Sequence, residues 1–157
     1  MINRRQFTLS GLSTTAIAAL GTAALAKDAP ASTDTGSASH FDKCARACSD
    51  CQRACDACAD YCAKSLTKGP AQHFDTLVSC LDCANVCSNA AQIVARRGSM
   101  ADLICHACAD ACARCAHQCE HHGGNDSIMT HCAQECRKCE TACREMLKHV
   151  GAEHSNE

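Results

Sequence analysis

Residues 44–62 read CARACSDCQRACDACADYC, and this stretch decides the fold. Its cysteines recur at alternating steps of four and three residues, from Cys44 to Cys62. Positions three and four apart lie on one face of an α-helix. The stretch therefore predicts a helix whose buried stripe consists of thiols in place of the usual Leu, Ile, Val and Phe.

The same spacing returns in three further stretches of the chain. Because every cysteine belongs to one of the four stretches, all of them are candidate metal ligands. In chain order they are Cys44, Cys48, Cys51, Cys55, Cys58, Cys62, then Cys80, Cys83, Cys87, then Cys105, Cys108, Cys112, Cys115, Cys119, and finally Cys132, Cys136, Cys139 and Cys143.

Turn residues bound the first two helices. The first is expected over residues 40–66, ending before the Lys68-Gly69-Pro70 breaker. The second is expected over residues 70–97, because Pro70 suits a first helical turn and Gly98 suits a helix end.

Capping residues bound the other two helices. Ser99 to Asp102 resembles a capping box that opens the third helix, which Gly123-Gly124 closes. Asn125 or Asp126 caps the fourth, which extends to Val150. Short connections make consecutive helices antiparallel neighbours. Residues 40–150 thus predict an all-α, antiparallel four-helix bundle with a cysteine-lined core, followed by a tail at 151–157.

The N-terminal segment has the features of an export leader. Residues 3–9, NRRQFTL, resemble the twin-arginine motif, and an Ala-rich apolar run follows. Ala24-Leu25-Ala26 fits a small-x-small cleavage site, so residues 1–26 are expected to be removed and 27–39 to form a flexible linker. An uncleaved anchor is the alternative, which Gly11 and Gly21 disfavour. The expected location is the periplasm or another exported compartment.

The composition limits what the chain does. A net charge of -2 with mixed surface charges gives no sign of a nucleic-acid partner, and no membrane contact is expected once the leader is removed. After Lys27, cysteines outnumber Leu, Ile, Val and Phe combined. A core of Ala and Cys buries little apolar area, at about 25 cal/mol per Å². Disulfides or metal are therefore expected to stabilise it.

Rows of thiolates favour Cu(I) over other metals. Soft thiolates select Cu(I), zinc or iron–sulfur clusters. Zinc prefers closed four-ligand sites, and iron–sulfur clusters use Cys-rich loops, whereas a continuous helical stripe suits neither. Cu(I) needs only two or three sulfurs, so multiple Cu(I) ions can occupy successive levels of the stripe. Copper donor and acceptor proteins, or chelators, are then the expected partners.

Two alternatives from other classes stay open. An even cysteine count in an exported chain is typical of a disulfide-braced structural module, although neighbours on one helix fit disulfide geometry poorly. A thiol redox protein would need one or two partly exposed, reactive cysteines, and none stands out in this pattern. No paired carboxylates lie on the cysteine face, so no enzymatic activity and no catalytic residue are expected.

The two ends of the predicted bundle differ in chemistry. At one end the stripes continue into Phe41, Val94 and Met146, with Ile93, Ile104 and Val150 nearby. At the other end they continue into His73, His122 and Met129, which are candidate entry ligands for copper. His117, His121 and His131 lie near these residues in sequence but off the stripe.

The repeated Cys-x-x-x-Cys and Cys-x-x-Cys spacings, from Cys44 through Cys143 on four helices, resemble the bacterial copper storage protein family. The resemblance covers nearly all of residues 40–150. It implies a four-helix bundle that stores many Cu(I) ions on its core cysteines. It also implies a homotetramer, and exported members of the family carry a twin-arginine signal.

Overall fold

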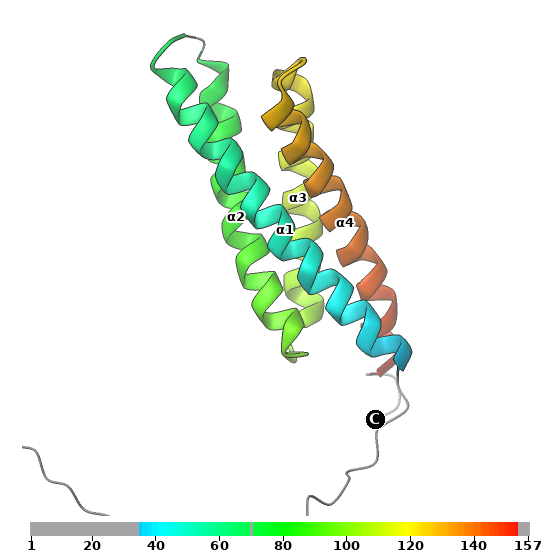
Figure 1. Cartoon of the computed structure of the whole chain (residues 1–157). Helices are drawn as coiled ribbons and strands as arrows, with labels where there is room; N and C mark the ends of the chain where they lie inside the picture. Colours follow the sequence, from blue (N-terminus) through cyan, green and yellow to red (C-terminus); the bar gives the residue numbers. More distant parts are fainter. Residues whose placement is uncertain (1–34, 70, 154–157) are drawn as a thin grey trace, which may run out of the picture. The chain divides into compact units, whose positions relative to one another are not determined.

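Four helices make up the part of the chain that the structure, a computed structural model, describes: residues 35–69 and 71–153. They are α1 (Thr35–Leu66), α2 (Gln72–Ala95), α3 (Ala101–Gly123) and α4 (Ser127–Glu153). Consecutive helices run antiparallel (Figure 1). The predicted all-α four-helix bundle is confirmed.

Each helix packs against two others. α1 packs along α2 and α4, and α3 packs along α2 and α4, whereas the diagonal helices of the described chain meet only through side chains of the core. The α1–α2 and α3–α4 connections lie at one end of the bundle, which we call the mouth end (Figure 1). The α2–α3 connection lies at the other end with the start of α1 and the finish of α4, and we call this the plugged end.

The core consists almost entirely of cysteine and alanine. All eighteen cysteines are buried, and alanines such as Ala90, Ala109 and Ala116 fill the positions beside them with no exposed area. Alanine has no side chain beyond Cβ, so facing helices come close enough for their cysteine sulfurs to meet. The sequence prediction of an Ala/Cys core is confirmed.

The plugged end holds the large apolar side chains, as predicted. Val94 and Met146 have no exposed surface, Phe41 is 5% exposed and Val150 is 7% exposed. Ile93 and Ile104 pack against this group from its edge. Hydrophobic burial of several large side chains therefore closes the bundle at this end.

An unusual backbone turn leads out of α2 at the plugged end. Arg97 has a φ of 52°, in the left-handed region that glycine usually occupies. The turn satisfies two helix-end carbonyls, because Gly98 N–H donates to the Ile93 carbonyl and Arg97 N–H donates to the Val94 carbonyl. The Arg97 guanidinium lies 5.9 Å from the centre of the Phe41 ring, a cation–π contact that joins α1 to this turn.

The predicted helix ends are partly right. Asp126 caps α4, since its Oδ1 accepts hydrogen bonds from the N–H groups of Ile128 and Met129. The prediction of a capping box at Ser99 is wrong. α3 begins at Ala101, its N-cap residue is Met100, and no side chain caps it. The Ala101 N–H donates to the Gly98 carbonyl instead. The tight turn after α2 supplies this backbone acceptor and leaves Ser99 outside the helix.

Two helices are also longer than expected. α1 begins at Thr35, inside the expected 27–39 linker, and α4 continues past Val150 to Glu153, through the start of the expected tail. The second helix begins at Gln72, later than expected. Residues 1–34, 70 and 154–157, and with them the expected leader, cleavage site and Pro70, lie outside the described residues.

Replacing Met146 with alanine tests whether the plugged end stabilises the bundle. Met146→Ala should lower the free energy of unfolding by about 2–4 kcal/mol, because it leaves a cavity in the one conventionally packed layer. The measurement is chemical denaturation of the metal-free protein followed by far-UV circular dichroism. Met100→Ala is the matched control, since Met100 is 62% exposed and should change stability little. Equal effects of the two substitutions would contradict this assignment.

Candidate metal centre

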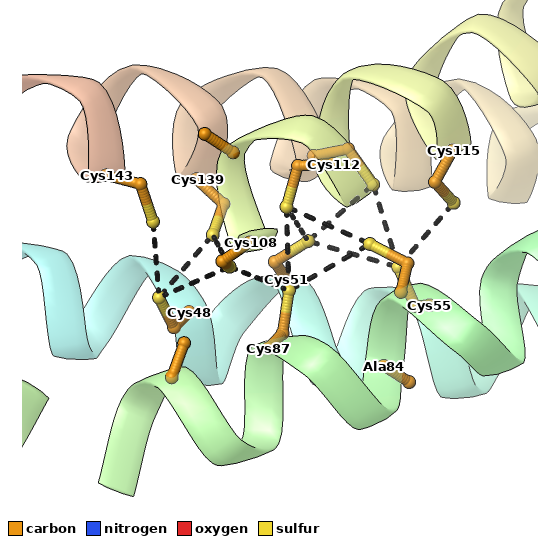
Figure 2. Packing of buried hydrophobic residues seen from close by; sticks show 14 of the residues in the cluster. Cys48, Cys51, Cys55, Ala84, Cys87, Cys108, Cys112, Cys115, Cys139 and Cys143 are labelled. Atoms are coloured by element: carbon orange, nitrogen blue, oxygen red, sulfur yellow. Dashed lines mark hydrogen bonds between the residues drawn. The ribbon is translucent and has the colours of Figure 1, made fainter. Parts of the chain in front are cut away.

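The eighteen cysteine sulfurs form one continuous row along the bundle axis, which we call the sulfur ladder. Each cysteine is at most 1% exposed. Figure 2 shows the middle of the ladder, where Cys48, Cys51 and Cys55 of α1 point toward cysteines of the other helices. The helical steps of three and four predicted in sequence thus turn every thiol inward, and all the predicted cysteine ligands are brought together.

Sulfur atoms on different helices lie close enough to share an ion. The Sγ atoms of Cys87 and Cys112 are 3.5 Å apart, and Cys44 and Cys143 are 3.6 Å apart. Contacts of up to 4.0 Å continue to Cys58 and Cys119 near the mouth end. None of the eighteen described cysteines forms a disulfide.

Some sulfur pairs come from a single helix. Cys51 and Cys55 are 3.9 Å apart at Sγ, as are Cys83 and Cys87. Side chains four residues apart on a helix are neighbours, so a Cys-x-x-x-Cys step can supply two ligands by itself. The two thiols of such a step lie side by side at both of these positions.

The sulfurs also gather in groups of four whose Sγ atoms all lie within 4.8 Å of one another. The groups include Cys48/Cys108/Cys139/Cys143, Cys51/Cys83/Cys87/Cys112, Cys51/Cys55/Cys83/Cys136, Cys55/Cys115/Cys132/Cys136 and Cys58/Cys80/Cys119/Cys132.

The last four of these groups are linked by shared members. Cys51, Cys55, Cys83, Cys132 and Cys136 each belong to two of them. Closed tetrahedral zinc sites need four ligands each, so neighbouring groups could not all be filled in that way. An ion that needs only two or three sulfurs, or that shares bridging thiolates, can occupy every level.

Protonation of the ladder depends on burial and on neighbouring thiols. Burial, with the nearby Cys58, raises the pKa of Cys62 to about 12, so this group is a neutral thiol near pH 7. Hydrogen bonding with Cys112 lowers the pKa of Cys83 to about 7. Because a buried row of thiolates without counter-ions is costly, a cation that binds here must displace protons and supply the compensating charge.

The predicted entry ligands lie at the mouth end, on three different helices. Met129 of α4 is 1% exposed, and His73 of α2 and His122 of α3 are partly buried. The Nδ1 atom of His73 is buried without a hydrogen-bond partner among the described residues. Tyr61 of α1 stands edge-on to the His73 ring, with the ring centres 6.0 Å apart.

Close helix packing holds Met129 beside the end of α3. A Cβ atom added at Gly123 would lie 2.9 Å from the Met129 Cβ, a distance that real side chains do not reach. Glycine at this position therefore allows the last turn of α3 to approach the first turn of α4. The thioether of Met129 is buried as a consequence of that approach.

Sequence reasoning missed two features of the mouth end. Thr76 is fully buried, and its Oγ1 has no hydrogen-bond partner among the described residues. It continues the stripe, since the steps from His73 to Thr76 and from Thr76 to Cys80 are three and four. The α2 stripe therefore holds a hydroxyl one step above Cys80.

The second missed feature is a histidine cluster on α3. The Nδ1 atoms of His121 and His122 are 3.4 Å apart, and the rings of His117 and His121 stack with centres 6.1 Å apart. The spacing of four residues between His117 and His121 was the available signal. Of the histidines that the sequence placed off the stripe, His131 is exposed on α4.

Comparison with known proteins gives one family. The model of the copper storage protein family, described as "Copper storage protein", matches residues 36–148. No curated protein matches the sequence.

Solved structures match closely in fold. A cytosolic copper storage protein from Streptomyces lividans, solved during copper loading with five coppers, is 32% identical over 71% of this chain and 95% of that chain, with a TM-score of 0.65. The same organism's protein loaded with 10 copper equivalents is 31% identical over 77% of this chain and 93% of that chain, with a TM-score of 0.66.

A third match extends the comparison to a second organism. The Cu(I)-bound copper storage protein 3 of Bacillus subtilis is 28% identical over 69% of this chain and 98% of that chain, with a TM-score of 0.61. The family match spans all four helices and every cysteine of the ladder. The chain therefore belongs to the copper storage protein family.

Proposed function

We propose that this protein stores multiple Cu(I) ions on the thiolates of all eighteen core cysteines. The observation that carries the proposal is the overlap of the four-sulfur groups, which gives a continuous run of binding positions with no exposed thiol. Membership of the copper storage family supports the choice of copper over other soft metals. The protein holds its cargo and catalyses no reaction.

Storage fits the ladder better than thiol redox chemistry does. A redox enzyme needs a thiolate that its substrate can reach, whereas every cysteine here is at most 1% exposed. The sulfurs also differ little in surroundings along the middle of the ladder. Many similar positions provide capacity, whereas redox chemistry would require one distinct site.

Binding of Cu(I) compensates the negative charge that buried thiolates would otherwise place in the core. Each ion that binds two thiols can release two protons and leave a local charge near -1, and sharing of thiolates between ions brings the row closer to neutrality. Buried thiols such as Cys62, with its raised pKa, become anionic only as copper replaces their protons. Loading therefore stabilises the folded state in proportion to the number of ions bound.

Copper is proposed to enter and leave at the mouth end, through His73, His122 and Met129. Imidazole and thioether groups bind Cu(I) less strongly than thiolates, so an ion can pass from them to the ladder. The unpartnered Nδ1 of His73 and Oγ1 of Thr76 supply polar atoms above Cys80. The core layer at the plugged end includes large apolar groups such as Phe41, Val94 and Val150, which are poor carriers for a cation.

Export by the twin-arginine route is part of the proposal and rests on the sequence of residues 1–26. That route carries folded proteins, so the thiols would be buried before they meet an oxidising compartment. The periplasm is the proposed location, and copper donor and acceptor proteins or chelators are the proposed partners. A homotetramer is proposed by resemblance to the family, with no nucleic-acid partner and no membrane contact after the leader is removed.

Thiol titration separates storage from a disulfide-braced module. The metal-free protein should yield eighteen reactive thiols after unfolding in denaturant under anaerobic conditions. In the folded state the same reagent should react much more slowly, because no cysteine is more than 1% exposed. The measurement is absorbance with a thiol-specific reagent, with and without denaturant. Recovery of most thiols only after chemical reduction would support the disulfide alternative.

Removing two sulfurs from the middle of the ladder tests whether the sites are independent. Cys55→Ala with Cys112→Ala should lower Cu(I) capacity by about one or two ions while the fold is retained, because each ion needs only nearby sulfurs. Anaerobic Cu(I) titration against a competing chelator measures the capacity. Cys44→Ala with Cys105→Ala, a pair 3.8 Å apart nearer the plugged end, should cause a similar loss. Complete loss of binding in either variant would instead indicate one cooperative cluster.

Alanine at His73, His122 and Met129 together tests the mouth. Uptake and chelator-driven release of Cu(I), followed by stopped-flow absorbance, should both slow by about tenfold or more if these weak ligands carry the ion inward. Total capacity should change by one ion at most.

A matched control uses the same residue types at the plugged end. Alanine at His40, His149 and Met100 should leave both rates unchanged, since these side chains lie away from the mouth. If this control variant is slow and the mouth variant is not, copper enters at the opposite end.

A further inference from the structure

One face of the bundle is apolar although it packs against no other helix of the described chain. Phe74, Val78 and Leu81 of α2 are 56%, 41% and 46% exposed. Their spacing of four and three residues places them in one stripe on the outer side of the helix. We call these three residues the α2 stripe. In soluble proteins, a contiguous apolar patch on the surface is usually a contact site for another molecule.

The composition of α2 is apolar enough for a helix that is buried on more than one face. Among the described helices, it is the one whose length and apolar composition would allow it to cross a membrane. Only about a third of this apolar segment, His73–Ala95, is buried in the bundle. Its inner face lines the sulfur ladder and accounts for that buried part. The exposed apolar residues are therefore not explained by the storage core.

Charged groups beside the α2 stripe lack partners within this chain. Asp75 and Asp82 of α2 and Arg114 of α3 take part in none of the salt bridges of the described residues. On α1, by comparison, Arg53 pairs with Asp50 and Lys64 pairs with Asp60.

These three charges surround a hollow beside the stripe. Phe74, Val78, Asp75, Asp82 and Arg114 all line a cavity of about 490 Å³ between α2 and α3. A surface with an apolar strip, acids on one helix and a base on the next is self-complementary. A two-fold rotation brings the two apolar strips together and places the acids of one copy opposite the base of the other.

We propose that the α2 stripe is where two copies of this chain associate, in an antiparallel α2–α2 pairing about a two-fold axis near Val78. In this pairing Val78 meets its counterpart, and Phe74 packs near the Leu81 end of the partner helix. Asp75 and Asp82 of each copy face Arg114 of the other. The inference deepens the proposed function, because it names the surface on which the proposed homo-oligomer would assemble.

The charges also argue against a lipid surface as the occupant. A helix that binds membranes carries Lys or Arg beside its apolar face, to meet anionic headgroups. The charged residues of α2 are Asp75 and Asp82 alone, and both are acidic. Anionic lipids would repel this face, whereas a second copy offers Arg114.

The first experiment measures self-association of the full chain by sedimentation velocity over a range of micromolar concentrations. The wild-type chain should associate, and Val78→Glu should weaken association by about tenfold or more, because it places a carboxylate at the centre of the contact. Leu103→Glu is the control, since Leu103 is a 66% exposed apolar residue outside the stripe and should have no effect.

The second experiment exploits the charge pattern. Arg114→Glu alone, and Asp75→Lys with Asp82→Lys, should each weaken self-association, because like charges then face each other. Mixing these two variants should restore association as a heterodimer, since both charge contacts become attractive again. An effect confined to one chain cannot produce this rescue.

Several results would overturn the proposal. A wild-type chain that stays monomeric throughout the concentration range, an unchanged Val78→Glu variant, or mixed charge variants that stay apart would each do so. Flotation of a monomeric wild-type chain with phosphatidylglycerol vesicles, lost in Val78→Glu, would assign the stripe to membranes instead.

Copper capacity per chain, measured on the same samples, keeps this proposal separate from the storage function. Full capacity in a monomeric chain would refute the interface and leave storage intact. Low capacity in a chain that still associates would refute storage and leave the interface intact. Equal far-UV circular dichroism of all variants confirms that each is folded.

Discussion

The separation between sulfur atoms on facing helices is the constraint on which the rest of this structure depends. Contacts of 3.5–4.0 Å between Sγ atoms require helices that approach closely along most of their length. The buried alanines that share the core with the cysteines allow that approach, and larger residues would force the helices apart. The bundle therefore gives up most of the apolar burial that normally stabilises a core of this size. Large apolar side chains gather mainly at the plugged end, and Met129 is buried at the mouth end.

This arrangement links stability to cargo. The metal-free bundle relies on helix propensity, on the plugged end and on modest burial of small side chains. Each bound cation adds sulfur–metal bonds that exist only in the folded state, so the loaded protein resists unfolding more strongly. Fold and function use the same atoms, and a substitution in the ladder therefore affects both.

Much of the fold and of the cysteine site was predictable from local rules. The steps of three and four assigned every thiol to an inner face, and the Asp126 cap followed from its place before a helix. The Ser99 cap was wrong because the left-handed turn at Arg97 supplied a backbone acceptor that no propensity argument anticipates. Thr76 was missed because only sulfur and imidazole groups were considered as candidate ligands, and Thr76 contributes a hydroxyl to the same stripe. Which cysteines meet across helices depends on the rotation and packing of whole helices, which spacing alone does not determine. The contact of His121 with His122 within α3 depends on side-chain conformation, which spacing does not determine either.

The repeat of the ladder also limits how such a protein can change its capacity. A step of four and a step of three together make a heptad, so the pattern of steps repeats every seven residues along one helix face. Inserting a single residue in one helix would rotate all later thiols by about 100° and turn them out of the core. Lengthening one helix by a single residue therefore cannot extend the ladder. A longer ladder requires all four helices to lengthen together by whole heptads.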